Sequence, residues 1–327
     1  MTETIQAFTP EQVEKAHHLL ASAVAAMQGR KFEEEDWSSV YRLAKDIPHS
    51  TWSNLHIDVM HNGLGVEHKM LCLPQKKGIR EYCGTSQMHP SATRSIRVGD
   101  LNREPDEVMR DVFEQYGELI KSRTQLVGDA SSHDVAPDMR VGWLLWQNDL
   151  EEFMYFEEPM RAPDPSAHYA IWDIKAARGA RKGTKNLWVY DKKTKQKRYS
   201  ITTEAGAKIQ PYFDIPAPND PNLYYFRVQG EVLPSGSVRV WITPSTAICL
   251  TVAIGSLDSV KVEEEIMKAP AIDTSSTEYE ATTLNNLAKP LLLSKPAYHS
   301  LRSKYKGVSD DHCVLQFAEY LISKKSR

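Results

Sequence analysis

The sequence predicts an α+β protein, with helices concentrated at the front of the chain and an extensive mixed or antiparallel sheet behind them. Amphipathic segments with helix start signals fill residues 10–45. From Val141 onward, runs of aromatic and β-branched residues alternate with turn formers or charges, which is typical of strands. The chain has 327 residues and 41% hydrophobic content, enough to bury the core of one large domain or of two ordinary ones.

Helices are expected at both ends of the chain. Thr9 is a good N-cap, and Gln12 completes a capping-box pattern at the start of the first helix. The second helix is expected over Glu34–Lys45, where an acidic first turn suits the positive end of the helix dipole. Further amphipathic helices are expected over Glu104–Ser122 and Asp311–Ser323.

The first strands form a predicted hairpin, and the remaining strands occupy the second half of the chain. Apolar-rich runs at Asn54–Met60 and Leu64–Leu73 flank Asn62-Gly63, a pair that favours a tight hairpin turn because both residues accept a positive φ. Residues 1–135 are expected to hold the helices and the hairpin, and residues 136–327 a β-rich part, either separately or as one continuous domain. The later strand runs are 141–147, 152–156, 168–176, 186–191, 197–202, 207–215, 223–233, 237–243 and 247–254.

Charge and cysteine usage limit the class of protein. The net charge of -3 does not indicate a nucleic-acid binder, but residues 178–198 hold nine lysines and arginines against one acid, Asp191. That stretch fits either a solvated surface hairpin or a surface that faces phosphates. The four cysteines are scattered without zinc-site spacing, and no apolar run is long enough to cross a bilayer. Since no secretory signal is visible, we expect a cytoplasmic protein with no membrane association.

The hairpin carries the most informative set of polar residues. Glu67 and Lys69 alternate along one arm and therefore share a face of the strand, and the turn brings Asp58 on the other arm beside Glu67. Mg²⁺ is usually held by one or two carboxylates together with water and phosphate oxygens, so Asp58 and Glu67 suit it. A lysine beside them can orient an attacking water and offset charge on a phosphorane.

An Asp on one strand followed by Gly-x-Glu-x-Lys on the next resembles the core of the PD-(D/E)XK nuclease superfamily, to which most type II restriction endonucleases belong. The resemblance covers roughly residues 33–97 and assigns Asp58, Glu67 and Lys69 to the catalytic positions. It implies a mixed sheet flanked by helices, Mg²⁺ as cofactor, and a homodimer that cuts double-stranded DNA. The family often adds an acid from the preceding helix, for which Glu34 is available.

Two other groups of residues are alternative candidates for the functional site. Asp173 and Lys175 form an Asp-x-Lys in a more apolar strand, with Asp164 as an upstream acid, and they are the alternative catalytic set. A histidine and carboxylate site for zinc or iron is a further hypothesis. Its members are His56, Asp58, His61 and Glu67.

Residues suited to DNA contacts follow the hairpin and recur in the basic stretch. They are of types that contact phosphates or base edges, and include Gln87, His89, Arg94, Arg97, Arg178, Arg181, Lys182 and Lys185. The interpretation is a sequence-specific, Mg²⁺-dependent endonuclease. The alternative is a nucleic-acid-binding protein without catalysis that uses residues 178–198 alone.

Overall fold

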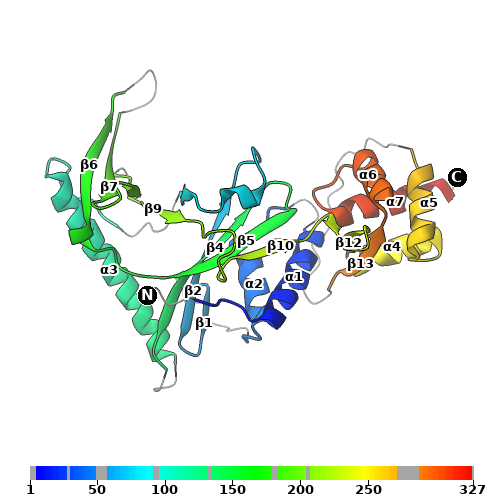
Figure 1. Ribbon diagram of the computed structural model, residues 1–327, viewed down its shortest axis with the longest axis horizontal. Helices are drawn as coiled ribbons and strands as arrows, with labels where there is room; N and C mark the ends of the chain where they lie inside the picture. The colour runs from blue at the N-terminus through cyan, green and yellow to red at the C-terminus, as the bar shows by residue number, and fades with distance from the viewer. Residues whose placement is uncertain are drawn as a thin grey trace.

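The computed structural model describes residues 5–27, 30–48, 57–90, 96–131, 135–177, 183–203, 207–270 and 287–325. The molecule is elongated (Figure 1). A central sheet lies in the middle, a second sheet with a long helix lies at one end, and the C-terminal helices lie at the other. The α+β class predicted from the sequence is confirmed.

The two N-terminal helices form where the sequence places them. In α1 (Pro10–Ala25), the Thr9 side chain accepts the Gln12 N–H at 3.3 Å, and the Gln12 side chain accepts the Thr9 N–H at 3.0 Å. The reciprocal bonds satisfy donors that a helix start otherwise leaves unpaired. α2 (Glu34–Ala44) begins at the predicted residue and buries Trp37 and Tyr41 completely.

The central sheet joins the front and the middle of the chain. Its order is β1 (Val59–His61), β2 (Leu64–Cys72), β4 (Asp138–Trp146), β5 (Glu152–Pro159) and β10 (Tyr224–Arg227). β2 and β4 are parallel and are connected through α3 (Pro105–Asp129), whereas the other neighbours are antiparallel. One sheet therefore contains strands from both of the predicted parts of the chain, residues 1–135 and 136–327. The division into these two parts stays a prediction.

The turn of the first hairpin is the one that its residues favour. Asn62 has a φ of 43° and Gly63 a φ of 80°, and Val59 pairs with Val66 across the turn. α1 and α2 cover one face of the sheet, where Trp37 packs on Tyr155 with ring centroids 4.7 Å apart. Full burial of one such side chain contributes roughly 1.5–3 kcal/mol.

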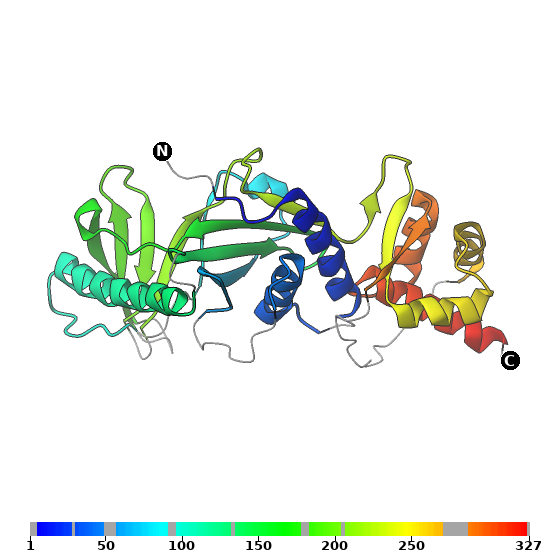
Figure 2. The same cartoon turned by 90° about the horizontal axis from the view of Figure 1, so that it is seen from below.

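The second sheet is an antiparallel meander beside α3. Its order is β3 (Ser86–Met88), β9 (Ile209–Asp214), β8 (Lys197–Ile201), β7 (Thr184–Asp191) and β6 (His168–Lys175). α3 lies along this sheet (Figure 2) and packs Val112 and Phe113 against its apolar side. Short 3₁₀ turns, η1 (Ile79–Tyr82) and η2 (Pro165–Ala167), precede β3 and β6.

The C-terminal group has its own apolar core between a small sheet and four helices. Its elements are β11 (Glu231–Val232), β12 (Val238–Ile242), α4 (Pro244–Ile254), α5 (Ser259–Lys268), β13 (Lys289–Leu293), α6 (Lys295–Lys304) and α7 (Asp310–Lys325). Among the described helices, none alone is long and apolar enough to cross a membrane; only α4 and α5 together, bent by 73°, reach that length and composition.

One predicted strand, at residues 247–254, is wrong, because α4 occupies it. The run is apolar on every side, so its periodicity does not separate a strand from a buried helix. The deciding signal lies just before it: the Thr243 side chain accepts the Thr246 N–H, and Pro244 takes the first helical position. The run at 223–233 also divides into β10 and β11 at Gly230, which has a φ of 57°.

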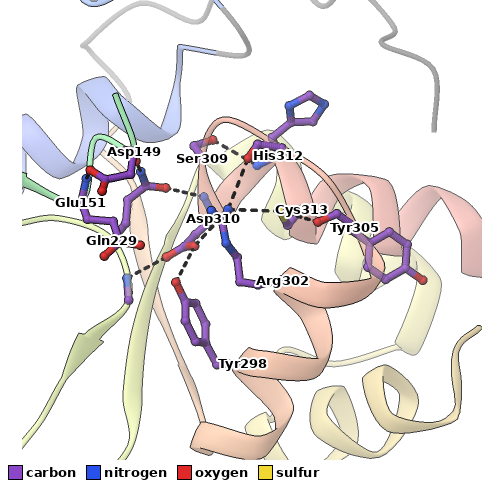
Figure 3. Close-up of polar contacts among 12 residues, drawn as sticks. Asp149, Glu151, Gln229, Tyr298, Arg302, Tyr305, Ser309, Asp310, His312 and Cys313 are labelled. Atoms are coloured by element: carbon purple, nitrogen blue, oxygen red, sulfur yellow. Dashed lines mark hydrogen bonds and ion pairs between the residues drawn. The ribbon is translucent and has the colours of Figure 1, made fainter. Parts of the chain in front are cut away.

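A buried polar network joins the C-terminal group to the central sheet (Figure 3). At the start of α7, the Asp310 carboxylate accepts the Gly230 N–H at 2.9 Å and the Tyr298 hydroxyl at 3.1 Å. The Asp310 N–H donates to the Gln229 side chain at 2.7 Å, and that side chain donates to the Asp149 carbonyl at 2.8 Å. The junction is thus held by specific hydrogen bonds beside the end of β10.

Candidate active site

Asp58 is fixed by the edge of β2 that β1 leaves open. β1 pairs with β2 only as far as Val66, so the next backbone donors on that edge have no strand partner from β1. The Asp58 carboxylate accepts the His68 N–H at 2.6 Å, and this side-chain hydrogen bond replaces the backbone hydrogen bond that a longer β1 would make. This bond holds Asp58 alongside Glu67, as the hairpin predicts.

Lys69 lies between two acids from different elements. Its Nζ is 2.9 Å from Glu67 Oε1 on the same strand and 3.5 Å from Glu34 Oε1 at the start of α2. The Glu67 side chain is 8% exposed and that of Lys69 is 14% exposed, so this ion pair is largely shielded from water. The structure therefore brings together all four residues of the predicted centre, Asp58, Glu67, Lys69 and Glu34.

Burial and neighbouring charges shift the pKa values of three groups in this cluster, Asp58, Glu34 and Lys69. Burial raises the pKa of Asp58, opposed by Lys69 and the His68 N–H, and the charge on Glu67 raises it further. Burial also raises the pKa of Glu34, opposed by Lys69. Burial lowers the pKa of the Lys69 ammonium, but Glu67 and Glu34 together outweigh that effect and the net change is upward. Lys69 is therefore a cation throughout the neutral range.

Arg123 is a member of this cluster that sequence reasoning missed. It comes from α3, is 7% exposed, and its guanidinium forms an ion pair with Glu67 Oε2. The predicted helix ended at Ser122, whereas α3 continues to Asp129. A longer helix places Arg123 on the same buried side as Ile120 and Val127, and this spacing was the signal available in the sequence.

A cavity of about 140 Å³ opens beside Glu67 and Lys69. It lies between the central sheet and the second sheet, with Tyr116 of α3 in its lining. Glu67, Val141 and Glu158 are aligned across β2, β4 and β5 by strand register, so both acids reach the cavity from one face. The remaining lining residues are Lys69, Trp143, Pro159, Met160, Arg161, Arg198, Tyr199, Pro211, Tyr212 and Phe213.

Glu158 is the other acid in the lining of the cavity. Its carboxylate accepts the indole N–H of Trp143 at 2.9 Å. Burial raises the pKa of this carboxyl, and the Trp143 hydrogen bond and the Arg198 charge only partly offset it. The cavity therefore has a second acid on the same sheet face as Glu67, two strands away.

The donor set fits an open Mg²⁺ site better than a closed metal cage. Within the described ranges, no three or more His, Cys, Asp or Glu side chains are arranged to hold a metal ion. Mg²⁺ needs only one or two carboxylates when water and phosphate complete its shell. Asp58 and Glu67 supply two, and a cation beside them would stabilise the Asp58 carboxylate, whose pKa is raised mainly by burial and further by the charge of Glu67.

His68, between Glu67 and Lys69, is a core residue. It is fully buried against α2, and its Nδ1 lies 2.8 Å from the Ser38 hydroxyl. Burial lowers its pKa to about 3, so the imidazole is neutral near pH 7. Of the histidines in the zinc or iron hypothesis, His56 lies outside the described residues and His61 is exposed at the turn.

The alternative set at Asp173 is spread out. The Asp173 and Lys175 side chains lie 3.8 Å apart near the end of β6. The Asp164 carboxylate instead accepts the Ser166 N–H at 2.8 Å in η2, before the strand begins. The strand from His168 to Asp173 spans roughly 17 Å at about 3.3 Å per residue, so Asp164 and Asp173 cannot share one metal ion.

The predicted DNA-contacting residues have mixed surroundings. His89 is 8% exposed, and Lys185 donates to the Leu101 carbonyl with its ammonium 4.3 Å from the Trp172 ring, so neither presents a free group to solvent. Gln87 donates to the Thr85 hydroxyl at 3.0 Å, and Arg97 is exposed. The others lie outside the described residues: Arg94, Arg178, Arg181 and Lys182.

Comparison of the chain with models of protein families, with curated proteins and with solved structures gave no match.

Proposed function

We propose that this protein is a Mg²⁺-dependent endonuclease that hydrolyses phosphodiester bonds of double-stranded DNA. The observation that carries the proposal is the presence of Glu67 and Lys69 in the lining of a cavity, with the buried lysine between Glu67 and Glu34. Asp58 is held next to them through its hydrogen bond with the His68 N–H. By its resemblance to type II restriction enzymes, we further propose sequence-specific cleavage by a homodimer.

Each residue of the centre has a distinct task. Asp58 and Glu67 are the carboxylates that would hold Mg²⁺, with Glu34 beside them at the start of α2. The ion supplies a positive charge that polarises the phosphate and acidifies an attacking water. Lys69 orients that water and offsets the charge that develops on the phosphate oxygens. Arg123 positions Glu67 through its ion pair and is a positioning residue.

The second candidate is a nucleic-acid-binding protein without catalytic activity. One observation favours it: Glu67 already contacts two cations, Arg123 and Lys69, so its charge is balanced without a metal ion. Under this alternative, binding is sensitive to salt and independent of Mg²⁺, because it rests on contacts between cations and phosphates.

Incubation with plasmid or phage DNA, with Mg²⁺ or with EDTA, separates the two candidates. We expect cleavage only with Mg²⁺, and discrete fragments would report sequence specificity. Asp58→Asn keeps the acceptor for the His68 N–H while removing the charge, so it should abolish cleavage and leave DNA binding largely intact.

Glu118→Gln is the matched control, because Glu118 is a 70% exposed acid on α3. It should cleave like the wild-type protein. Full activity in Asp58→Asn would remove the proposed catalytic centre, and DNA binding without cleavage under any divalent ion would favour the second candidate.

A further inference from the structure

The face of the second sheet that points away from α3 carries aromatic rings. Because side chains alternate along a strand, Ala170, Leu187 and Val189 pack toward α3 while their neighbours point the opposite way. Tyr169 and Tyr190 are paired across β6 and β7, and their rings are stacked with centroids 5.4 Å apart and planes at 18°.

Two more rings continue this face across β7, β8 and β9. Lys197 Nζ lies 3.4 Å from the centroid of the Trp188 ring and 5.5 Å from that of Tyr212. Tyr169, Trp188, Tyr190 and Tyr212, together with Lys197, form what we call the aromatic platform. Tyr212 also borders the cavity beside Glu67.

The aromatic platform is open in the part of the chain that the structure describes. The principal contacts of β6 to β9 are with each other, with β3, with η2 and with α3 on the opposite face. Ile171, which pairs with Trp188 across the strands, is 43% exposed. A row of partly exposed rings on an uncovered sheet is a surface suited to flat ligands.

The charge around the aromatic platform is positive. The strands and the turn that form it carry Lys175, Lys192, Lys193, Lys195 and Lys197. Of the acids nearby, Asp191 stabilises the turn between β7 and β8, where its carboxylate accepts the N–H groups of Lys193 and Thr194. Asp173 lies close to Lys197 and 3.8 Å from Lys175, and Asp214 on β9 is paired with Arg198 at 2.8 Å. The lysines of the turn, Lys192, Lys193 and Lys195, leave the balance positive.

We propose that the aromatic platform binds single-stranded nucleic acid. Unpaired bases would stack on Trp188 and its neighbouring rings while the lysines contact the phosphates. Base stacking on aromatic side chains together with a cationic surface is the usual basis of single-strand binding. A duplex keeps the faces of its bases stacked inside the helix and exposes only its backbone and base edges. A surface with four aromatic rings therefore favours an unpaired strand, whose base faces are free to stack. The inference does not rest on the proposed cleavage of DNA.

The test is the binding of a fluorescently labelled oligothymidine of about 15 nucleotides, measured by anisotropy in EDTA. We expect the wild-type protein to bind it more tightly than a duplex of the same length. Trp188→Leu keeps an apolar side chain without the flat ring and should weaken binding about tenfold. Trp188→Phe should retain most of the affinity, and Ile248→Ala, a change at a 67% exposed residue on α4, should have no effect.

A change on the ligand side keeps the test valid if a variant folds poorly. An oligonucleotide of abasic sugar phosphates carries the same charge without bases. The wild-type protein should bind it more than about tenfold more weakly than oligothymidine, because all stacked bases are lost and not one ring. Equal affinity for the two ligands, a preference for duplex, or unchanged binding by a folded Trp188→Leu protein would overturn the proposal. Binding is measured in EDTA, where no cleavage is expected, so a failure of the nuclease proposal would leave this result unaffected.

Discussion

Glu67 is the residue on which the buried ion cluster depends, because its two oxygens contact Lys69 and Arg123. The two partners differ in how well they could be predicted from the sequence. Lys69 is two positions away on the same strand, so strand alternation was enough to predict it. Arg123 is 56 residues away in sequence, and its contact depends on how α3 packs on the sheet.

Replacement of Arg123 by Met tests the weight of this contact. The variant leaves the buried Glu67 carboxylate with Lys69 as its one remaining cation. We expect the free energy of unfolding to fall by about 3–5 kcal/mol, as for other buried ion pairs that lose one partner. Urea denaturation measures it. Lys121→Met, at a 75% exposed position on the same helix, should change stability by less than about 0.5 kcal/mol, and a similar small effect in Arg123→Met would show that the contact is unimportant.

His68 gives a second prediction at the scale of the residue. Its pKa is about 3 in the folded protein, against an ordinary value of 6.5. Between pH 6.5 and pH 3, His68 is protonated in the unfolded chain but neutral in the folded protein. The free energy of unfolding therefore falls as the pH drops below 6.5, by up to about 1.4 kcal/mol per pH unit. Denaturation from pH 7 to pH 4 should show this loss in the wild-type protein and a smaller one in His68→Gln. The same pH dependence in both proteins would contradict the buried neutral histidine.

At the scale of the element, the outcome depended on how local each signal is. The Thr9 capping box and the Asn62-Gly63 turn are set by residues a few positions apart, and both form as predicted. The strand predicted at residues 247–254 was wrong, because an apolar run alone does not distinguish a strand from a helix; the cap before α4 does. The parallel pairing of β2 with β4 has no local signal, because a whole helix separates the strands.

The start of α7 carries an acid whose charge opposes folding. Asp311 is fully buried and accepts the Thr243 N–H at 2.6 Å, and burial raises its pKa from 3.8 to about 6. Between these values the folded protein holds a proton that the unfolded chain has lost. This contribution therefore strengthens folding as the pH drops from 6 toward 4 and weakens it as the pH rises.

Asp311→Asn keeps an acceptor for the Thr243 N–H without a charge. We expect the variant to gain stability relative to the wild-type protein at pH 7, and the gain to shrink toward pH 4. Thermal unfolding of both proteins across this range measures the difference. A difference that stays constant with pH would show that Asp311 does not titrate in the folded protein.

At the scale of the whole molecule, the candidate active site lies where three parts of the fold meet. Asp58, Glu67 and Lys69 come from the hairpin, Glu34 from the start of α2, and Arg123 from α3. The second sheet closes the cavity from the opposite side. The sequence allowed the hairpin residues to be grouped. The position of Glu158 beside them in the central sheet, and of Arg198 in the opposite wall, depends on contacts between distant strands.

The measurement that tests the central claim most directly is the rate of DNA cleavage by Lys69→Met in Mg²⁺, beside the wild-type protein. The substitution removes the ammonium but leaves Glu67 paired with Arg123, so the fold should persist. We predict a loss of at least about 100-fold in cleavage rate with DNA binding retained, because a positioned charge at the reacting phosphate is removed. Cleavage at the wild-type rate by a folded Lys69→Met protein would contradict the assignment of the active site to this hairpin.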